Sequence, residues 1–104
     1  MKKKNICLVS AEAVPFVKVG GMADVVGSLY KYLKSRENIY LFIPLYKQVK
    51  EKYKTENISP LEVRFFESRV ENGFLAKSRE FPDVYFIGHN KYFDRDELYG
   101  PGGK

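Results

Sequence analysis

Apolar positions in the first part of the chain form two short continuous runs and one helical stripe. The runs Ile6–Val9 and Ile39–Ile43 are typical of strands covered on both faces, as in a parallel sheet. Between them, apolar residues recur with the spacing of one helix face. These residues are Met22, Val25, Val26, Leu29 and Leu33. Residues 5–43 therefore predict a strand, a loop, a helix and a second, parallel strand, which form a βαβ unit with a right-handed crossover.

The second half of the chain has the pattern of a hairpin followed by another strand. Apolar and charged residues alternate over Leu61–Phe65, which predicts a half-buried strand. Asn72-Gly73 favours a tight turn, and residues 74–81 would return antiparallel to the strand Leu61–Phe65. After a break at Pro82-Asp83, the apolar run Val84–Ile87 predicts one more strand.

The overall fold expected from these elements is α/β. A short lysine-rich helix follows the second strand, with Tyr46, Val49 and Tyr53 on one side. The chain has 104 residues, of which 44% are hydrophobic, enough for one core but too few for two ordinary domains. We expect a single domain over residues 1–104, with a Rossmann-like three-layer parallel sheet and an inserted antiparallel β-hairpin.

The net charge and the cysteine content restrict the partners and the cellular compartment that we expect. The net charge of +5 suits an anionic partner without identifying it, and the lysines are scattered as on solvated faces. Cys7 is the single cysteine, so a disulfide within one chain is excluded, and its place in an apolar run predicts burial. Lys2–Lys4 resemble the start of a signal peptide, but Glu12 interrupts the apolar stretch too soon. We expect a cytoplasmic protein with no membrane partner.

The stretch Lys18–Asp24 carries the candidate chemistry. Gly20 and Gly21 follow the first strand by a short loop and precede the helix, with Gly21 as the expected N-cap. Residues without side chains let the backbone approach a ligand, and the first helical N–H groups favour an anion. Lys18 would add a positive charge at the same point. This arrangement predicts a site for a phosphate group.

Each residue of this stretch also has a plainer interpretation. A Gly-Gly pair most often makes only a turn, and Lys18 beside it can be an ordinary loop lysine. Asp24 can be a first-turn carboxylate that matches the helix dipole. Glu12 can be a solvated loop residue, and His89 a loop histidine without chemistry. The residue pattern alone leaves these alternatives open.

A longer comparison of motifs gives a family resemblance. Residues 12–29 resemble the N-terminal signature of bacterial glycogen synthases and plant starch synthases, which carry Lys-x-Gly-Gly-Leu followed by Ala-Asp-Val-Val. Met22 stands where leucine is usual in that signature, a tolerated apolar exchange. A second patch, with Tyr92–Arg95 and Leu98–Gly100, is similar to the same family. The resemblance extends from Ile6 to Gly103.

The resemblance implies a fold and an activity. The family has the GT-B fold, in which two Rossmann-like domains face each other across a cleft. This chain is similar to the first part of the N-terminal one, without the second. The implied activity is that of a retaining glucosyltransferase, which moves glucose from ADP-glucose to the non-reducing end of an α-1,4-glucan. The implied enzyme needs no metal and no cofactor.

The resemblance also implies roles for the residues of the candidate stretch. Lys18 would meet the diphosphate or glucosyl part of ADP-glucose, and the Gly20 and Gly21 backbone would lie against the sugar and phosphates. Asp24 would lie near the donor, and Glu12 would face the glucan or the donor. No catalytic residue is assigned, because the central histidine and the other donor-binding residues of the family lie in regions outside this chain.

Three functions follow as competing expectations. The first is a glycogen or starch synthase fragment that is inactive alone because half of the donor cleft is missing. The second is a non-catalytic module that binds nucleotide sugar or glucan. The third, a nucleic-acid binder, is disfavoured because there is no basic stripe or base-stacking motif. A dehydrogenase is disfavoured too, since no Gly-x-Gly-x-x-Gly follows the first strand. Uncovered apolar surface makes self-association an additional expectation.

Overall fold

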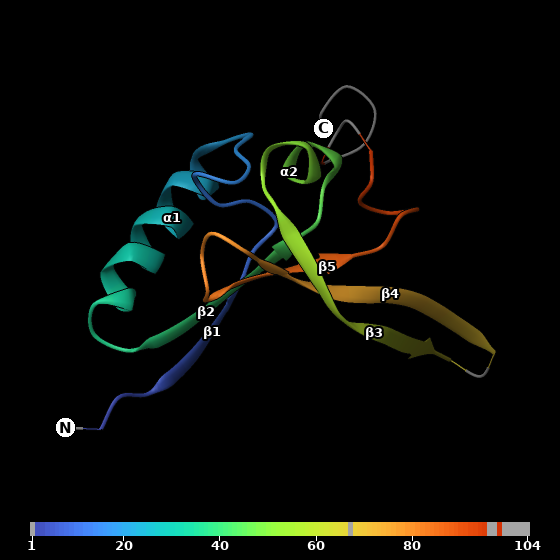
Figure 1. The fold of residues 1–104 in the computed structure, drawn as a ribbon, viewed down its shortest axis with the longest axis horizontal. Coiled ribbons are helices and arrows are strands. Elements are labelled where there is room, and N and C mark those ends of the chain that lie inside the picture. The colour runs from blue at the N-terminus through green and yellow to red at the C-terminus, as the bar shows by residue number, and fades with distance from the viewer. Residues whose placement is uncertain (1, 67, 96–97, 99–104) are drawn as a thin grey trace.

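The structure is a computed structural model that describes residues 2–66, 68–95 and 98. Its elements, in chain order, are β1 (Asn5–Val9), α1 (Gly21–Lys34), β2 (Asn38–Pro44), α2 (Lys47–Lys52), β3 (Thr55–Phe65), β4 (Arg69–Ser78) and β5 (Val84–Gly88). Figure 1 shows one sheet from which the β3–β4 hairpin extends, with both helices on its upper side in that view.

The strands form one mixed sheet in the order β1-β2-β5-β4-β3. β1 and β2 are parallel, with Ile6 opposite Ile39, and β5 continues the parallel part, with Val84 opposite Leu41. β4 is antiparallel to both β5 and β3. The predicted βαβ unit, the short helix α2 and the antiparallel hairpin are confirmed, and with them the α/β fold class.

The core lies on one face of the sheet. Alternate residues of the three parallel strands point to this face, among them Leu41, Ile43, Val84 and Phe86, all of which are fully buried. Val49 of α2 and Val26 of α1 belong to the same cluster, so both helices cover this face. In the residues that the structure describes, no helix forms a layer over the second face.

Two predictions about β1 are wrong because, in the described residues, no helix covers the second face of the sheet. Cys7 is exposed rather than buried, and Val9 is 72% exposed, so β1 is not covered on both faces. β1 lies at the edge of the sheet, and its alternate residues Ile6 and Leu8 are the ones that pack against the core. A continuous apolar run shows that a strand has no polar face, but it does not show what covers each side.

The hairpin turn is also placed differently from the prediction. Asn72 and Gly73 lie inside β4, where they pair with Glu62 and Leu61, and the last pair before the chain reverses is Phe65 with Arg69. A Cβ atom on Gly73 would stand 2.4 Å from the carbonyl oxygen of Gly88. Glycine is therefore required here because β4 and β5 approach each other closely, not because the chain reverses.

Candidate functional site

The loop between β1 and α1, residues 10–20, is fixed against the core. Phe16 is buried, and its ring lies 5.1 Å, 5.2 Å and 5.8 Å from the ring centroids of Tyr53, Phe81 and Phe86. The Tyr46 hydroxyl donates a hydrogen bond of 2.8 Å to the Ala11 carbonyl oxygen. An aromatic cluster and a long-range hydrogen bond thus hold this loop in one conformation.

The same loop packs against the first two turns of α1. The Val14 N–H donates to the Ala23 carbonyl oxygen at 3.1 Å. A Cβ atom on Gly27 would stand 2.8 Å from the Val14 carbonyl oxygen, so the glycine in the helix permits this contact. The contact partner of Gly27 is thus this loop and not a strand of the sheet.

Glu12 accepts hydrogen bonds from the backbone that leads into the glycine pair. Its side chain is almost fully buried, with 3% of the residue exposed, and Oε1 accepts hydrogen bonds from the N–H groups of Val19 at 3.1 Å and Gly20 at 2.9 Å. The interpretation of Glu12 as a solvated loop residue is therefore wrong. A buried carboxylate that accepts backbone N–H groups makes strong hydrogen bonds and orders the segment that donates them. Glu12 thus sets the course of the backbone just before α1.

Lys18 and Asp24 form an ion pair on the outer side of this loop. The Lys18 Nζ and Asp24 Oδ2 atoms are 2.8 Å apart, and the two side chains are 52% and 54% exposed. An ion pair this exposed contributes about 0–1 kcal/mol to folding. The pair keeps the ammonium group close to the first turn of α1 while leaving it accessible from solvent.

The start of α1 is open. The helix begins at Gly21 with Gly20 as its N-cap, one residue earlier than predicted. No acceptor within the described residues takes the N–H group of Gly21 or Met22, whereas the Gly20 N–H is held by Glu12. Cβ atoms built on Gly20 and Gly21 would meet nothing within 4 Å. Two N–H groups without an acceptor among the described residues, the helix dipole and an ammonium group together suit an anion.

Two surface cavities flank the loop. One, of about 390 Å³, lies between the loop and α1 and is lined by Asp24, Gly27 and Lys31 on the helix side and by Val14 and Phe16 on the loop side. The other, of about 370 Å³, lies at the carboxyl ends of β1, β2 and β5. In open α/β sheets, ligands bind outside the carboxyl ends of the parallel strands. The loop therefore stands at the edge of the sheet where a ligand is expected.

The C-terminal half of α1 is held in place by contacts with Asp83. The Tyr30 hydroxyl donates a hydrogen bond to the Asp83 carboxylate, and Lys34 lies 3.7 Å from the same carboxylate. Burial, together with the neighbouring carboxylate, raises the pKa of Tyr30 above its ordinary range. The phenol therefore remains a donor at neutral pH and helps to keep α1 in place over β2.

The described part of the chain offers no metal centre and no membrane span. Within residues 2–66, 68–95 and 98, no three His, Cys, Asp or Glu side chains gather as metal ligands would. None of the helices in these ranges has the length and apolar character needed to cross a membrane.

Fold and site together define a class of protein. A parallel βαβ unit, with a lysine- and glycine-bearing loop that leads from the first strand into an open helix start, is a Rossmann-like α/β domain. The particular family follows from comparison with known proteins. The profile of the family described as "Starch synthase catalytic domain" matches residues 5–104, and the chain belongs to this family. The resemblance inferred from the motifs is thereby confirmed.

Individual relatives agree with this assignment. The glycogen synthase of Thermodesulfovibrio yellowstonii is 35% identical over 113 residues, covering 92% of this chain and 23% of the relative. The glycogen synthase of Fervidobacterium nodosum is 39% identical over 109 residues, covering 93% of this chain and 22% of the relative. The chain thus spans less than a quarter of the length of these relatives.

A solved structure shows the same fold. The catalytic domain of starch synthase IV from Arabidopsis thaliana, determined with ADP and acarbose bound, superposes with a TM-score of 0.76 at 25% sequence identity. The match covers 97% of this chain and 22% of that structure. The arrangement of the five strands and the hairpin is therefore that of a starch synthase catalytic domain.

Proposed function

We propose that this chain forms one wall of the donor site of a retaining glucosyltransferase, in the N-terminal Rossmann-like domain of a GT-B protein. The whole protein would transfer glucose from ADP-glucose to the non-reducing end of an α-1,4-glucan. The observation that carries this proposal is the open start of α1, with Lys18 held beside it by Asp24. Membership of the starch synthase family and the ADP bound to the plant relative support the choice of ligand.

In this proposal each residue of the loop has a distinct role. The N–H groups of Gly21 and Met22 donate to the diphosphate of ADP-glucose, and Lys18 neutralises part of its charge. Gly20 and Gly21 let the donor approach the backbone, because neither has a Cβ atom in the way. Asp24 holds the ammonium group in place near the donor. Glu12 fixes the loop from the buried side, so its contribution to donor or glucan binding is indirect.

The chain by itself is proposed to bind the donor weakly and to transfer no glucose. A transition state between donor and acceptor needs groups on both sides of the reacting atoms, and this chain supplies one wall. We also propose that the protein acts in the cytoplasm without a metal or cofactor. The single cysteine, Cys7, suits a reducing compartment. Self-association through the uncovered face around Cys7 and Val9 stays a prediction.

Titration with ADP tests the proposed donor site. Lys18→Ala is expected to weaken ADP binding about tenfold, because it removes a charge worth roughly 1.4 kcal/mol to the complex. Isothermal titration calorimetry at low ionic strength measures the dissociation constant. Lys52→Ala is the matched control, since it removes an equal charge from the exposed end of α2. Equal weakening in both variants would reveal nonspecific attraction to a basic protein and contradict the proposal.

A further inference from the structure

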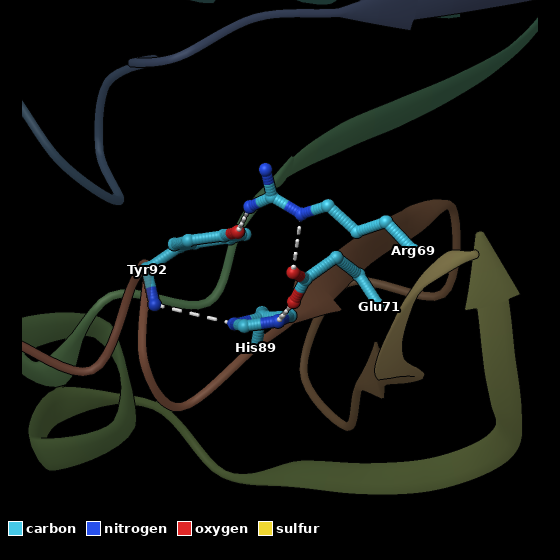
Figure 2. A network of polar contacts seen from close by, with 4 residues as sticks. All are labelled: Arg69, Glu71, His89 and Tyr92. Carbon is cyan, nitrogen blue, oxygen red and sulfur yellow. Dashed lines mark hydrogen bonds and ion pairs between the residues drawn. The ribbon is translucent and has the colours of Figure 1, made fainter. Parts of the chain in front are cut away.

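A polar network ties the turn end of the β3–β4 hairpin to the segment that follows β5 (Figure 2). Arg69 and Glu71 lie on β4, and His89 and Tyr92 lie just after β5. His89 Nε2 is 2.9 Å from Glu71 Oε1, and Arg69 Nε donates to Glu71 Oε2 at 3.2 Å. Arg69 Nη2 donates to the Tyr92 hydroxyl at 3.0 Å. The rings of His89 and Tyr92 stack, with centroids 4.0 Å apart.

The protonation state of His89 follows from its partners. The Tyr92 backbone N–H can only donate, and it lies 3.2 Å from His89 Nδ1. Nδ1 must therefore carry the lone pair, so the proton of the neutral ring is on Nε2, where it is donated to Glu71. The closed network thus requires a neutral imidazole with one defined tautomer.

We propose that His89 is a pH-sensitive latch that holds residues 89–95 against the β3–β4 hairpin and releases the Tyr92 backbone when the imidazole is protonated. Protonation places a hydrogen on Nδ1, and two donors then face each other across a 3.2 Å contact. Glu71 still pairs with the ring through Nε2, so the ring stays in place while the Tyr92 N–H loses its acceptor.

The charged groups around His89 also favour release of the Tyr92 backbone when the imidazole is protonated. Glu71 is shared by Arg69 and His89, so protonation of the ring sets two cations around one carboxylate. The Lys91 ammonium lies 6.0 Å from the centroid of the Tyr92 ring and adds a third cation nearby. Among the described residues, Lys50 and Asp94 also lie here and pair with each other at 3.3 Å, and the Arg95 guanidinium donates to the Leu98 carbonyl oxygen at 3.0 Å.

The hydrogen bonds to Glu71 affect its own protonation. The hydrogen bond from His89, helped by Tyr92 and then by Arg69, lowers the pKa of Glu71 below its ordinary range. A carboxylate with a lowered pKa contributes fully to stability above the ordinary carboxyl range and loses that contribution only as the pH falls through the lowered value. The Glu71 carboxylate therefore stays ionised, and able to accept from His89 Nε2, until the pH falls below the ordinary carboxyl range.

The latched segment reaches towards the candidate site. Phe93 packs edge-on against Tyr46, with ring centroids 6.0 Å apart, and Tyr46 donates to Ala11 in the β1–α1 loop. Asp94 pairs with Lys50 of α2. Release of Tyr92 therefore loosens a segment that is connected, through Tyr46, to the loop that carries Lys18.

Amide hydrogen exchange in the 104-residue chain tests the latch. His89 is the single histidine, so its ring resonances can be followed without ambiguity. Between pH 8 and pH 5.5, the protection of the Tyr92 amide, corrected for its intrinsic exchange rate, is expected to fall about tenfold, in step with the His89 ring signals. The amide of Val49, buried in α2, is the internal control and should keep its protection.

His89→Asn separates the latch from a general effect of pH. An asparagine Oδ1 can take the place of Nδ1 as acceptor for the Tyr92 N–H, and it does not titrate in this range. Tyr92 protection in this variant should therefore be independent of pH. Two results would overturn the proposal: Tyr92 protection in the unmodified chain that does not follow the His89 titration, or an unchanged pH dependence in His89→Asn.

Discussion

Replacement of Phe16 with alanine is expected to lower the free energy of unfolding by about 3–5 kcal/mol, the range for truncating a buried aromatic side chain. Phe16 is 3% exposed and contacts the rings of Tyr53, Phe81 and Phe86. Its loss would leave a cavity between the β1–α1 loop and the core. Urea denaturation followed by far-ultraviolet circular dichroism measures the change.

Phe66→Ala is the matched control for this experiment. Phe66 is 96% exposed at the tip of the hairpin, so its truncation should change the unfolding free energy by less than about 0.5 kcal/mol. If Phe16→Ala were as stable as the control variant, the aromatic cluster would not anchor the loop. The fixed geometry that the proposed donor site requires would then lack its main support.

Glu12→Ala is expected to cost about 3 kcal/mol of stability and to reduce ADP binding as well. The substitution removes the acceptor of two backbone N–H groups, those of Val19 and Gly20, in a buried position. Hydrogen bonds to a charged group contribute about 1.5–3 kcal/mol each, and this carboxylate accepts two. Denaturation curves and ADP titration of the same preparations report both effects.

Glu12→Gln keeps a carbonyl oxygen at the position of Oε1 and removes the charge. This variant should therefore lose much less stability than Glu12→Ala, about 1 kcal/mol. An unchanged ADP affinity in a folded Glu12→Ala protein would show that the course of residues 18–20 does not depend on the carboxylate. Glu12 would then have no positioning role in the proposed site.

Much of the fold was predictable because its elements are local. The helical spacing from Met22 to Leu33 predicts α1, and the short apolar runs Ile6–Val9 and Ile39–Ile43 predict β1 and β2. The apolar stripe does not predict the buried face of α1, because Met22, Val25 and Leu29 are exposed. Long-range contacts decide where the hairpin turn falls. Asn72-Gly73 has the sequence of a turn, but the close approach of Gly73 to Gly88 in the neighbouring strand places it inside β4. Tertiary packing thus overrides a local turn preference.

The candidate site was only partly visible in the sequence. Gly20, Gly21 and Lys18 stand together in the chain, so their proximity could be predicted. The bonds from Val19 and Gly20 to Glu12 span seven and eight residues across an irregular loop, and no periodic pattern marks such pairs. The same holds for His89, which meets Glu71 across two antiparallel strands. Loop conformation and strand register, which decide these contacts, are settled by packing.

A ¹H–¹⁵N spectrum of the chain, recorded during titration with ADP, tests most directly whether the start of α1 binds the diphosphate. We predict that the amide signals of Gly21 and Met22 shift most and saturate together, because their N–H groups face the ligand. Saturation at the dissociation constant found by calorimetry would tie the shifts to the same site. Shifts scattered over the lysine-bearing surface, or confined to residues remote from the β1–α1 loop, would contradict a donor site at this position.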